Sequence, residues 1–119
     1  MEITLFNSKG AAEAYIKTDD NNTIYLWSGN AVAYIENECI FGWNGKHLGW
    51  YINEVLYDLQ ELCVGFTRKT SPVACYAEPA KYAKYAKYAK YARYAPYARP
   101  ALSNGMSQSS LQDFLKTGK

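Results

Sequence analysis

The residue best suited to acid–base chemistry at neutral pH is His47, the only histidine of the 119-residue chain. An imidazole titrates near neutrality, so it could act as a general acid or base. Catalysis would also need a partner acid or a nucleophile, and the turn at residues 44–47 supplies neither. We therefore expect His47 to lie at an exposed or edge position, and we expect no enzyme.

The cysteines Cys39, Cys63 and Cys75 are odd in number and lack the close spacing of metal ligands. A disulfide framework or a zinc site is therefore not expected. The sequence also has no phosphate-binding glycine loop and no paired carboxylates placed for catalysis, so it indicates no cofactor. Cys39 and Cys63 fall in predicted strands, and we interpret them as small buried hydrophobic residues.

Residues 79–100 repeat alanine, a basic residue and tyrosine with a period of three. A non-specific single-stranded nucleic-acid binder uses such a mixture, with cations for phosphates and rings for bases. The alternative, which we favour, is a solvated low-complexity spacer. The candidate binding residues of the repeat are Lys81, Tyr82, Lys84, Tyr85, Lys87, Tyr88, Lys90, Tyr91, Arg93 and Tyr94.

Helix propensity decides the expected conformation of this tail. Alanine, lysine and arginine favour a helix and Pro79 suits a first turn, so we expect a helix from Pro79 to about Ala95, ended by Pro96. A three-residue step gives such a helix no single apolar face. In polyproline II the same period would separate Ala, Lys and Tyr onto three faces, and we keep that as the second conformation.

A sixteen-residue repeat decides the architecture of the rest of the chain. Residues 21–68 hold three copies, and a fourth copy precedes them with three extra residues in the segment 17–21. Each copy has a short strand-like run, a turn and a returning strand. Glycine occupies the turn in three copies, whereas the last copy has Gln60, Glu61 and Leu62 there, which makes its turn the least certain.

Aromatic and small residues recur at fixed places in the repeat. The aromatic set is Phe6, Tyr25, Phe41 and Tyr57, and the small set is Ala14, Ala33, Gly49 and Gly65. A small strand residue often leaves room for a ring, so we expect four equivalent contacts between a ring and a small residue. One hairpin cannot bury its own apolar face, so we expect a mainly β fold in which four hairpins form an eight-stranded, pseudo-fourfold meander.

The pattern of aromatic residue, turn glycine, small residue and second aromatic spans residues 2–68 and resembles the bacterial four-fold β-flower domain, in which four hairpins radiate like petals. The copies run from Phe6 to Tyr15, Tyr25 to Tyr34, Phe41 to Trp50 and Tyr57 to Phe66. The resemblance implies a fold. The family has no established activity, so the resemblance implies neither a function nor site residues.

The expected organisation is a four-hairpin domain at residues 1–69, a linker at 70–78, the triplet tail at 79–100 and a flexible C-terminus at 101–119. A short helix could form at residues 110–116, capped by Ser110. Leu111, Phe114 and Leu115 would share one face of it. We take this face as a docking motif for another protein, unless it frays or folds back onto its own domain.

Charge is divided unevenly along the chain. Residues 1–70 carry nine acidic and five basic residues, a net charge of −4, whereas residues 71–119 carry two and eight, a net charge of +6. The basic arm could reach nucleic acid, an anionic membrane or the chain's own domain. Residues 1–6 lack the features of a secretory signal and no stretch approaches the length of a membrane helix, so the expected location is the cytoplasm.

Trp27 and Trp43 occupy equivalent places beside hairpin tips. They are the candidate exposed aromatics for partner contact, unless the small core takes them in. We expect a non-enzymatic interaction or scaffold module that binds a protein partner, or itself, through exposed aromatics or its basic tail. The alternative is non-specific nucleic-acid binding through the tail, and a third option is a small-ligand site on the pseudo-fourfold axis.

Overall fold

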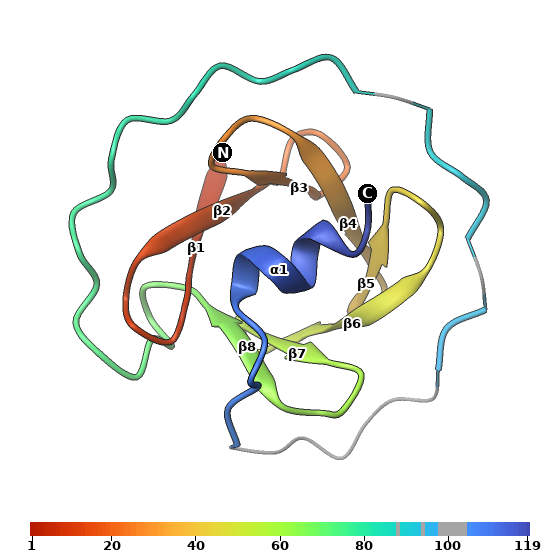
Figure 1. Ribbon diagram of the computed structural model, residues 1–119. Coiled ribbons are helices and arrows are strands. Elements are labelled where there is room, and N and C mark those ends of the chain that lie inside the picture. The colour runs from red at the N-terminus through yellow and green to blue at the C-terminus, as the bar shows by residue number, and fades with distance from the viewer. Residues whose placement is uncertain (88, 94, 98–104) are drawn as a thin grey trace.

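The computed structural model describes residues 1–87, 89–93, 95–97 and 105–119. Those residues form eight antiparallel strands and one short helix (Figure 1). Each strand pairs with the next, and β1 also pairs with β8, so the sheet is a closed barrel and the predicted four-hairpin β fold is confirmed. The elements are β1 (Glu2–Phe6), β2 (Ala12–Lys17), β3 (Thr23–Leu26), β4 (Ala31–Glu36), β5 (Cys39–Gly42), β6 (His47–Ile52), β7 (Val55–Asp58), β8 (Cys63–Phe66) and α1 (Leu111–Lys116).

Turns with positive φ join the strands. Asn37 and Glu38, between β4 and β5, have φ of 51° and 67°, the geometry of a tight two-residue hairpin turn. The tips of the second and third hairpins use Gly29 and Gly45, with φ of 103° and 88°. The fourth tip, the least certain in the sequence, also has positive φ, with Glu61 at 69°.

The interior of the barrel is aliphatic and α1 closes it. Leu5, Ile24, Ile40 and Leu56 come from equivalent places in the four hairpins, and all are fully buried. Leu111, Phe114 and Leu115 of α1 belong to the same core cluster, and α1 lies at the centre of the ring of strands (Figure 1). The apolar face predicted for this helix therefore packs inside the chain's own barrel. It occupies the pseudo-fourfold axis on which a small-ligand site was considered.

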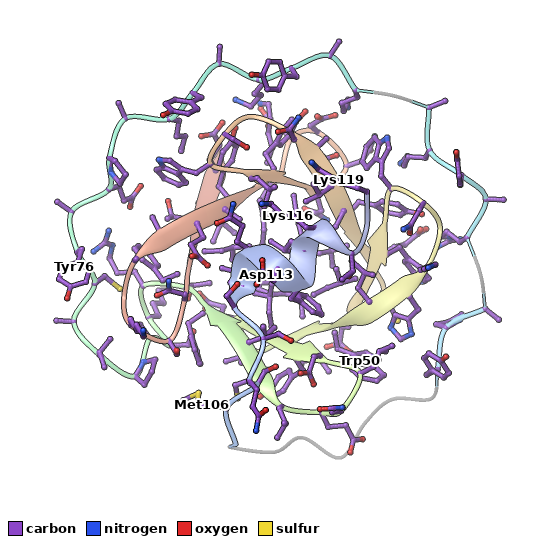
Figure 2. All side chains as sticks on the ribbon, in the orientation of Figure 1. Trp50, Tyr76, Met106, Asp113, Lys116 and Lys119 are labelled. Carbon is purple, nitrogen blue, oxygen red and sulfur yellow. The ribbon has the colours of Figure 1, made fainter. Side chains whose placement is uncertain are left out.

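Local contacts lead the chain into this helix. Cys63 in β8 donates its backbone N–H to the Gly105 carbonyl at 2.8 Å, and Ser107 donates to the Cys63 carbonyl at 2.7 Å. Ser110 then caps α1, because its Oγ accepts the Asp113 backbone N–H at 3.0 Å. Asp113 lies on the exposed face of the helix (Figure 2).

The small residues of the repeat make room for α1. A Cβ on Gly65 would lie 2.8 Å from Leu111 Cδ1. A Cβ on Gly49 would lie 2.0 Å from the backbone oxygen of Tyr57 in β7 and 3.1 Å from Phe114 Cζ, so this glycine allows close approach of both the neighbouring strand and α1. At Gly49 and Gly65 the expected contact with a strand ring is therefore wrong. Successive residues of a strand point to opposite faces of the sheet. The aliphatic residues therefore fill the interior of the barrel, and the aromatic residues next to them in the strands pack on its outer wall, in clusters separate from the aliphatic core.

The described residues between Tyr76 and Tyr97 form an extended belt around the outside of the barrel (Figure 1). Its described residues between Pro79 and Tyr97 form neither helix nor strand, so the helix expected from Pro79 to Ala95 is wrong for that part of the chain. A helix would present no common face to the barrel, whereas an extended chain can contact one hairpin after another. The candidate residues Tyr88 and Tyr94 lie outside the described residues.

The belt advances nine residues for each hairpin that it passes. Its backbone N–H groups donate to carbonyl oxygens at successive hairpin tips: Tyr76 to Gly10 (2.9 Å), Tyr82 to Trp27 (3.3 Å), Tyr85 to Gly29 (3.0 Å) and Tyr91 to Trp43 (3.0 Å). Nine extended residues span about 28 Å at ~3.1 Å per residue. A molecule with extents of 37 × 36 Å has a quarter-circumference of about 28 Å. Three triplets per hairpin therefore keep the belt in step with the barrel.

Candidate functional site

Two clusters of aromatic rings, which we call the first and the second cleft, lie on the outer wall where neighbouring hairpins meet. In the first cleft, Tyr15 of β2 stacks on Tyr25 of β3 with ring centroids 5.5 Å apart, and it meets Trp27 edge-on at 5.8 Å. The second cleft repeats this arrangement with Tyr34, Phe41 and Trp43, at 5.8 and 6.0 Å. Because the rings of each cleft come from two hairpins, the pairing of consecutive hairpins, β2 with β3 and β4 with β5, builds the clefts.

Cations of the belt lie over these rings. Lys81 Nζ is 4.5 Å from the ring centroid of Tyr15 and 5.3 Å from that of Trp27. Lys90, nine residues further along, occupies the equivalent position in the second cleft, with its Nζ 4.3 Å from the Tyr34 ring centroid. We call such a position, where a cation lies against a cleft, a seat. Each such cation–π contact contributes about 0.5–1 kcal/mol at an exposed site.

A second seat follows three residues along the belt. Lys84 Nζ lies 5.3 Å from the Tyr15 ring and 5.6 Å from the Tyr25 ring. Arg93, again nine residues on, lies 5.1 Å from the Phe41 ring. The basic residues of the triplets therefore face the barrel, which is the separation of faces that a period of three produces in an extended chain.

Glu2 joins two cations of the first cleft. Its Oε1 accepts from Lys81 Nζ at 2.5 Å and its Oε2 from Lys84 Nζ at 3.0 Å. The bond from Lys81 is the main reason that the pKa of the Glu2 carboxyl lies below its usual value. One carboxylate thus serves two neighbouring seats.

Other carboxylates engage the next cations. Asp20 accepts from Lys87 Nζ at 2.7 and 2.9 Å and from the Tyr25 hydroxyl at 2.9 Å, and the Lys87 contact lowers the pKa of Asp20. Glu36 pairs with Arg93. Of the partners considered for the basic arm, the chain's own domain is therefore the one that the arm meets in this structure.

Tyrosines of the belt are among the most exposed side chains of the described residues, as the labelled Tyr76 illustrates (Figure 2). Tyr76, Tyr82, Tyr85, Tyr91 and Tyr97 are each 62–70% exposed. Because neighbouring backbone groups are hydrogen-bonded to the hairpin tips, these rings are presented at set positions around the molecule. An ordered series of exposed rings is the feature of this surface best suited to partner contact.

The two tryptophans form walls of the clefts. Trp43 is only 8% exposed and Trp27 is half-buried. Each lies beneath a lysine, Lys90 or Lys81. The two tryptophans are therefore less exposed than the described tyrosines of the belt, which are the candidates for partner contact instead.

His47 is buried, at 5% exposure, and the expectation of an exposed or edge position is wrong. Its Nδ1 accepts the Tyr97 backbone N–H at 3.0 Å, so its Nε2 carries the proton and donates to the Gly49 carbonyl at 2.8 Å. The imidazole also stacks on the Tyr97 ring and meets Trp50 edge-on. Burial lowers the pKa of His47. Its covering residue comes from the belt, fifty positions away, which the local sequence did not indicate.

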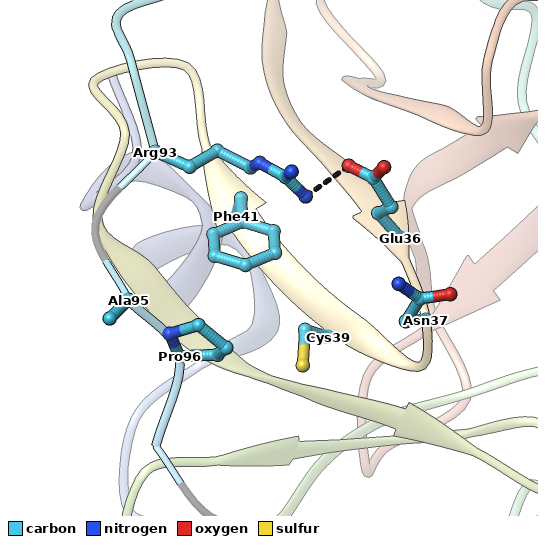
Figure 3. A pocket seen from close by; sticks show the side chains of 7 residues that line it. All are labelled: Glu36, Asn37, Cys39, Phe41, Arg93, Ala95 and Pro96. Atoms are coloured by element: carbon cyan, nitrogen blue, oxygen red, sulfur yellow. Dashed lines mark hydrogen bonds and ion pairs between the residues drawn. The ribbon is translucent and has the colours of Figure 1, made fainter.

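A cavity of about 490 Å³ opens beside the second cleft (Figure 3). Phe41 and Cys39 lie along one side of it, and the Arg93–Glu36 ion pair and Pro96 border it. Cys39 is half-buried and Cys63 is buried, and burial raises the pKa of both thiols. Within the described residues no group of side chains is arranged to hold a metal ion. The described part of the chain likewise has no helix with the length and apolarity to span a bilayer.

Comparison with known proteins extends the resemblance along the chain. A family model described as a 4-fold beta flower protein matches residues 3–115. The match includes the belt segment and most of α1 as well as the hairpins, so it reaches well beyond residues 2–68. No curated protein and no solved structure matches the chain.

Proposed function

This chain belongs to the 4-fold β-flower family, and we propose that it is a non-enzymatic interaction module that binds a protein partner through the tyrosines of its belt. The observation that carries the proposal is the division of the belt into two faces. Its cations face the clefts, whereas four tyrosines, each 62–70% exposed, face solvent: Tyr76, Tyr82, Tyr85 and Tyr91. Family membership supplies a fold and no activity.

Tyrosine suits such a surface for physical reasons. Its ring is large and amphipathic and has few rotatable bonds, so it buries much area on binding at a small entropic cost. The backbone between the rings is already hydrogen-bonded to the hairpin tips. Ordering before binding reduces the entropy that a partner complex must overcome.

Non-specific nucleic-acid binding is the alternative function, supported by the basic composition of the tail. It is the weaker proposal because Lys81, Lys84 and Lys87 contact carboxylates, as does Arg93. Phosphate groups would have to compete with those ion pairs. We propose the cytoplasm as the location, a reducing compartment in which the thiols of Cys39 and Cys75 would stay reduced.

The test compares three full-length proteins immobilised in the same way and exposed to a lysate of the source organism. In one variant Tyr82, Tyr85 and Tyr91 become alanine; in the matched control they become phenylalanine, which keeps the rings. We expect proteins that the wild type and the phenylalanine variant retain and the alanine variant loses. Circular dichroism confirms that each of the three proteins is folded. If all three then retain the same lysate proteins, the tyrosine face is not the binding surface.

A further inference from the structure

The two clefts differ at one seat. In the first cleft three belt cations follow one another at intervals of three, Lys81, Lys84 and Lys87. In the second cleft, nine residues further along, Lys90 and Arg93 take the first two seats. The third position is Pro96, which carries no charge. The belt therefore supplies one cation fewer to the second cleft.

The first cleft shows how the third seat is built. Lys87 places its ammonium against both carboxylate oxygens of Asp20, at 2.7 and 2.9 Å. The neighbouring ring is Tyr25, whose hydroxyl donates to the same carboxylate at 2.9 Å. The seat thus combines a carboxylate for the charge with an aromatic ring beside it.

The second cleft has the same parts around an open space. Sixteen residues after Asp20 and Tyr25, the repeat places Glu36 and Phe41. These two residues and Pro96 border the cavity of about 490 Å³ (Figure 3). Arg93 contacts Oε2 of Glu36, which leaves Oε1 as the oxygen for a second cation.

We propose that this cavity is a seat for a lysine side chain of a partner protein. The lysine ammonium contacts Glu36, and its aliphatic stem lies along Phe41 and Pro96, as lysine stems do on apolar surfaces. Glu2, which holds Lys81 and Lys84 with its two oxygens, is the precedent for one carboxylate between two cations. Lysine fits better than arginine, because a bidentate guanidinium would need both oxygens of Glu36.

The seat lies beside the belt, on the circumference that also carries the exposed tyrosines. It names one contact of the protein partner proposed above and in that sense rests on the proposed function. A short peptide can nevertheless test the seat without that partner. A failure of one proposal can therefore be told from a failure of the other.

The experiment titrates the full chain with the peptide acetyl-Tyr-Ala-Lys-Tyr-Ala-amide and follows backbone amide signals by NMR. A second peptide with norleucine in place of lysine keeps the stem and removes the charge. We expect millimolar binding of the lysine peptide, with shifts at Asn37, Cys39 and Phe41. The norleucine peptide should bind at least fivefold more weakly, and Glu36→Gln should weaken the lysine peptide to a similar extent.

Substitutions in the belt fill or open the seat. Pro96→Lys supplies the chain's own lysine and should weaken peptide binding at least fivefold. Pro96→Ala loses the ring contact but supplies no cation, so it should weaken binding clearly less than Pro96→Lys does. Lys87→Ala opens the equivalent seat in the first cleft and should add a second set of shifts around Asp20 and Tyr25. The matched Lys87→Met keeps the stem in place and should add none.

Three results would overturn the proposal. They are equal affinity for the two peptides, unchanged affinity in Pro96→Lys, and no shift around the cavity at millimolar peptide. If the peptide binds as expected but the alanine variant of the tyrosines retains every partner, the lysine site is supported and the tyrosine surface is overturned. If the peptide does not bind but a partner depends on the tyrosines, the tyrosine surface is supported and the lysine site is overturned.

Discussion

Gly29, at the tip of the second hairpin, lies directly against the carbonyl oxygen of Ala83 in the belt. Two residues further along, Tyr85 donates its backbone N–H to the Gly29 carbonyl at 3.0 Å. The same close approach recurs nine residues on, between Gly45 and Ala92. Hairpin and belt therefore meet backbone to backbone, at a place where a side chain would hold them apart.

Gly29→Ala tests this contact. The new Cβ would overlap the Ala83 oxygen, and φ of 103° is strained for alanine. We expect a loss of about 1–3 kcal/mol in the free energy of unfolding, measured in urea. Hydrogen exchange of the Tyr85 amide should accelerate, while the Tyr91 amide, one hairpin away, serves as the internal control. If the substitution changes the exchange rate of neither the Tyr85 amide nor the Tyr91 amide, the contact between Gly29 and Ala83 is contradicted.

Leu115→Ala tests whether α1 is part of the core. Leu115 is fully buried in the aliphatic cluster, and truncating such a residue costs about 2–5 kcal/mol. The matched control is Lys116→Ala, on the exposed face of the same helix, which should change the free energy of unfolding by less than ~0.5 kcal/mol. If both variants unfold at the same denaturant concentration as the wild type, α1 does not fill the barrel.

The strands could be predicted from the sequence because their signals are local and repeat four times. Aromatic and β-branched runs mark the first strand of each hairpin, and turn residues such as Gly29 and Asn37 mark where the chain reverses. The structure places β3 at Thr23–Leu26 and β5 at Cys39–Gly42, where such runs occur. The same repetition predicts an eight-stranded meander, and the structure adds its closure by the pairing of β1 with β8.

The belt and the place of α1 could not be predicted from local signals. Helix propensity favours a helix for the alanine-rich triplets, but contacts with distant hairpins decide the conformation, as those of Lys81 with Tyr15 and Glu2 show. One usable signal was present. Three triplets make nine residues, and nine extended residues match one hairpin step. His47 was misplaced for the same reason, because Tyr97 covers it from the belt.

His47 should make stability depend on pH. Burial lowers its pKa in the folded chain, so between the folded value and the unfolded value of about 6.5 the unfolded chain binds more protons. Its contribution is complete above about pH 6.5 and declines as the pH falls below that value. Glu2 and Asp20, whose pKa values are also lowered, lose their contributions only at more acidic pH, below their unfolded values.

Urea unfolding at pH 7.5 and 5.5 separates these groups. The wild type should be less stable at pH 5.5. The Tyr97 amide should also be less protected there, relative to its intrinsic exchange rate at that pH, because protonated Nδ1 no longer accepts its hydrogen bond. His47→Gln should lose most of this pH dependence. An unchanged difference between the two pH values in the variant would assign the effect to other groups.

Nucleic-acid binding should depend on the ion pairs of the belt. We expect the wild type to bind fluorescent single-stranded DNA weakly, because belt cations are already held by carboxylates. Replacing Glu2 with Gln, Asp20 with Asn and Glu36 with Gln releases those cations. The triple variant should bind more tightly, with a steeper salt dependence of about 0.7 in log–log slope for each added phosphate contact. Tight, steeply salt-dependent binding by the wild type would favour the nucleic-acid function instead.

The division of the belt into an inward cationic face and an outward tyrosine face underlies both proposals, and NMR of the full chain tests it most directly. We predict nuclear Overhauser contacts from the Lys81 methylenes to the rings of Tyr15 and Trp27, with the upfield shifts that aromatic faces cause. The Tyr82 and Tyr85 ring protons should show no such contacts with the barrel. Random-coil shifts for Lys81, or barrel contacts from the tyrosine rings in place of the lysines, would contradict the account.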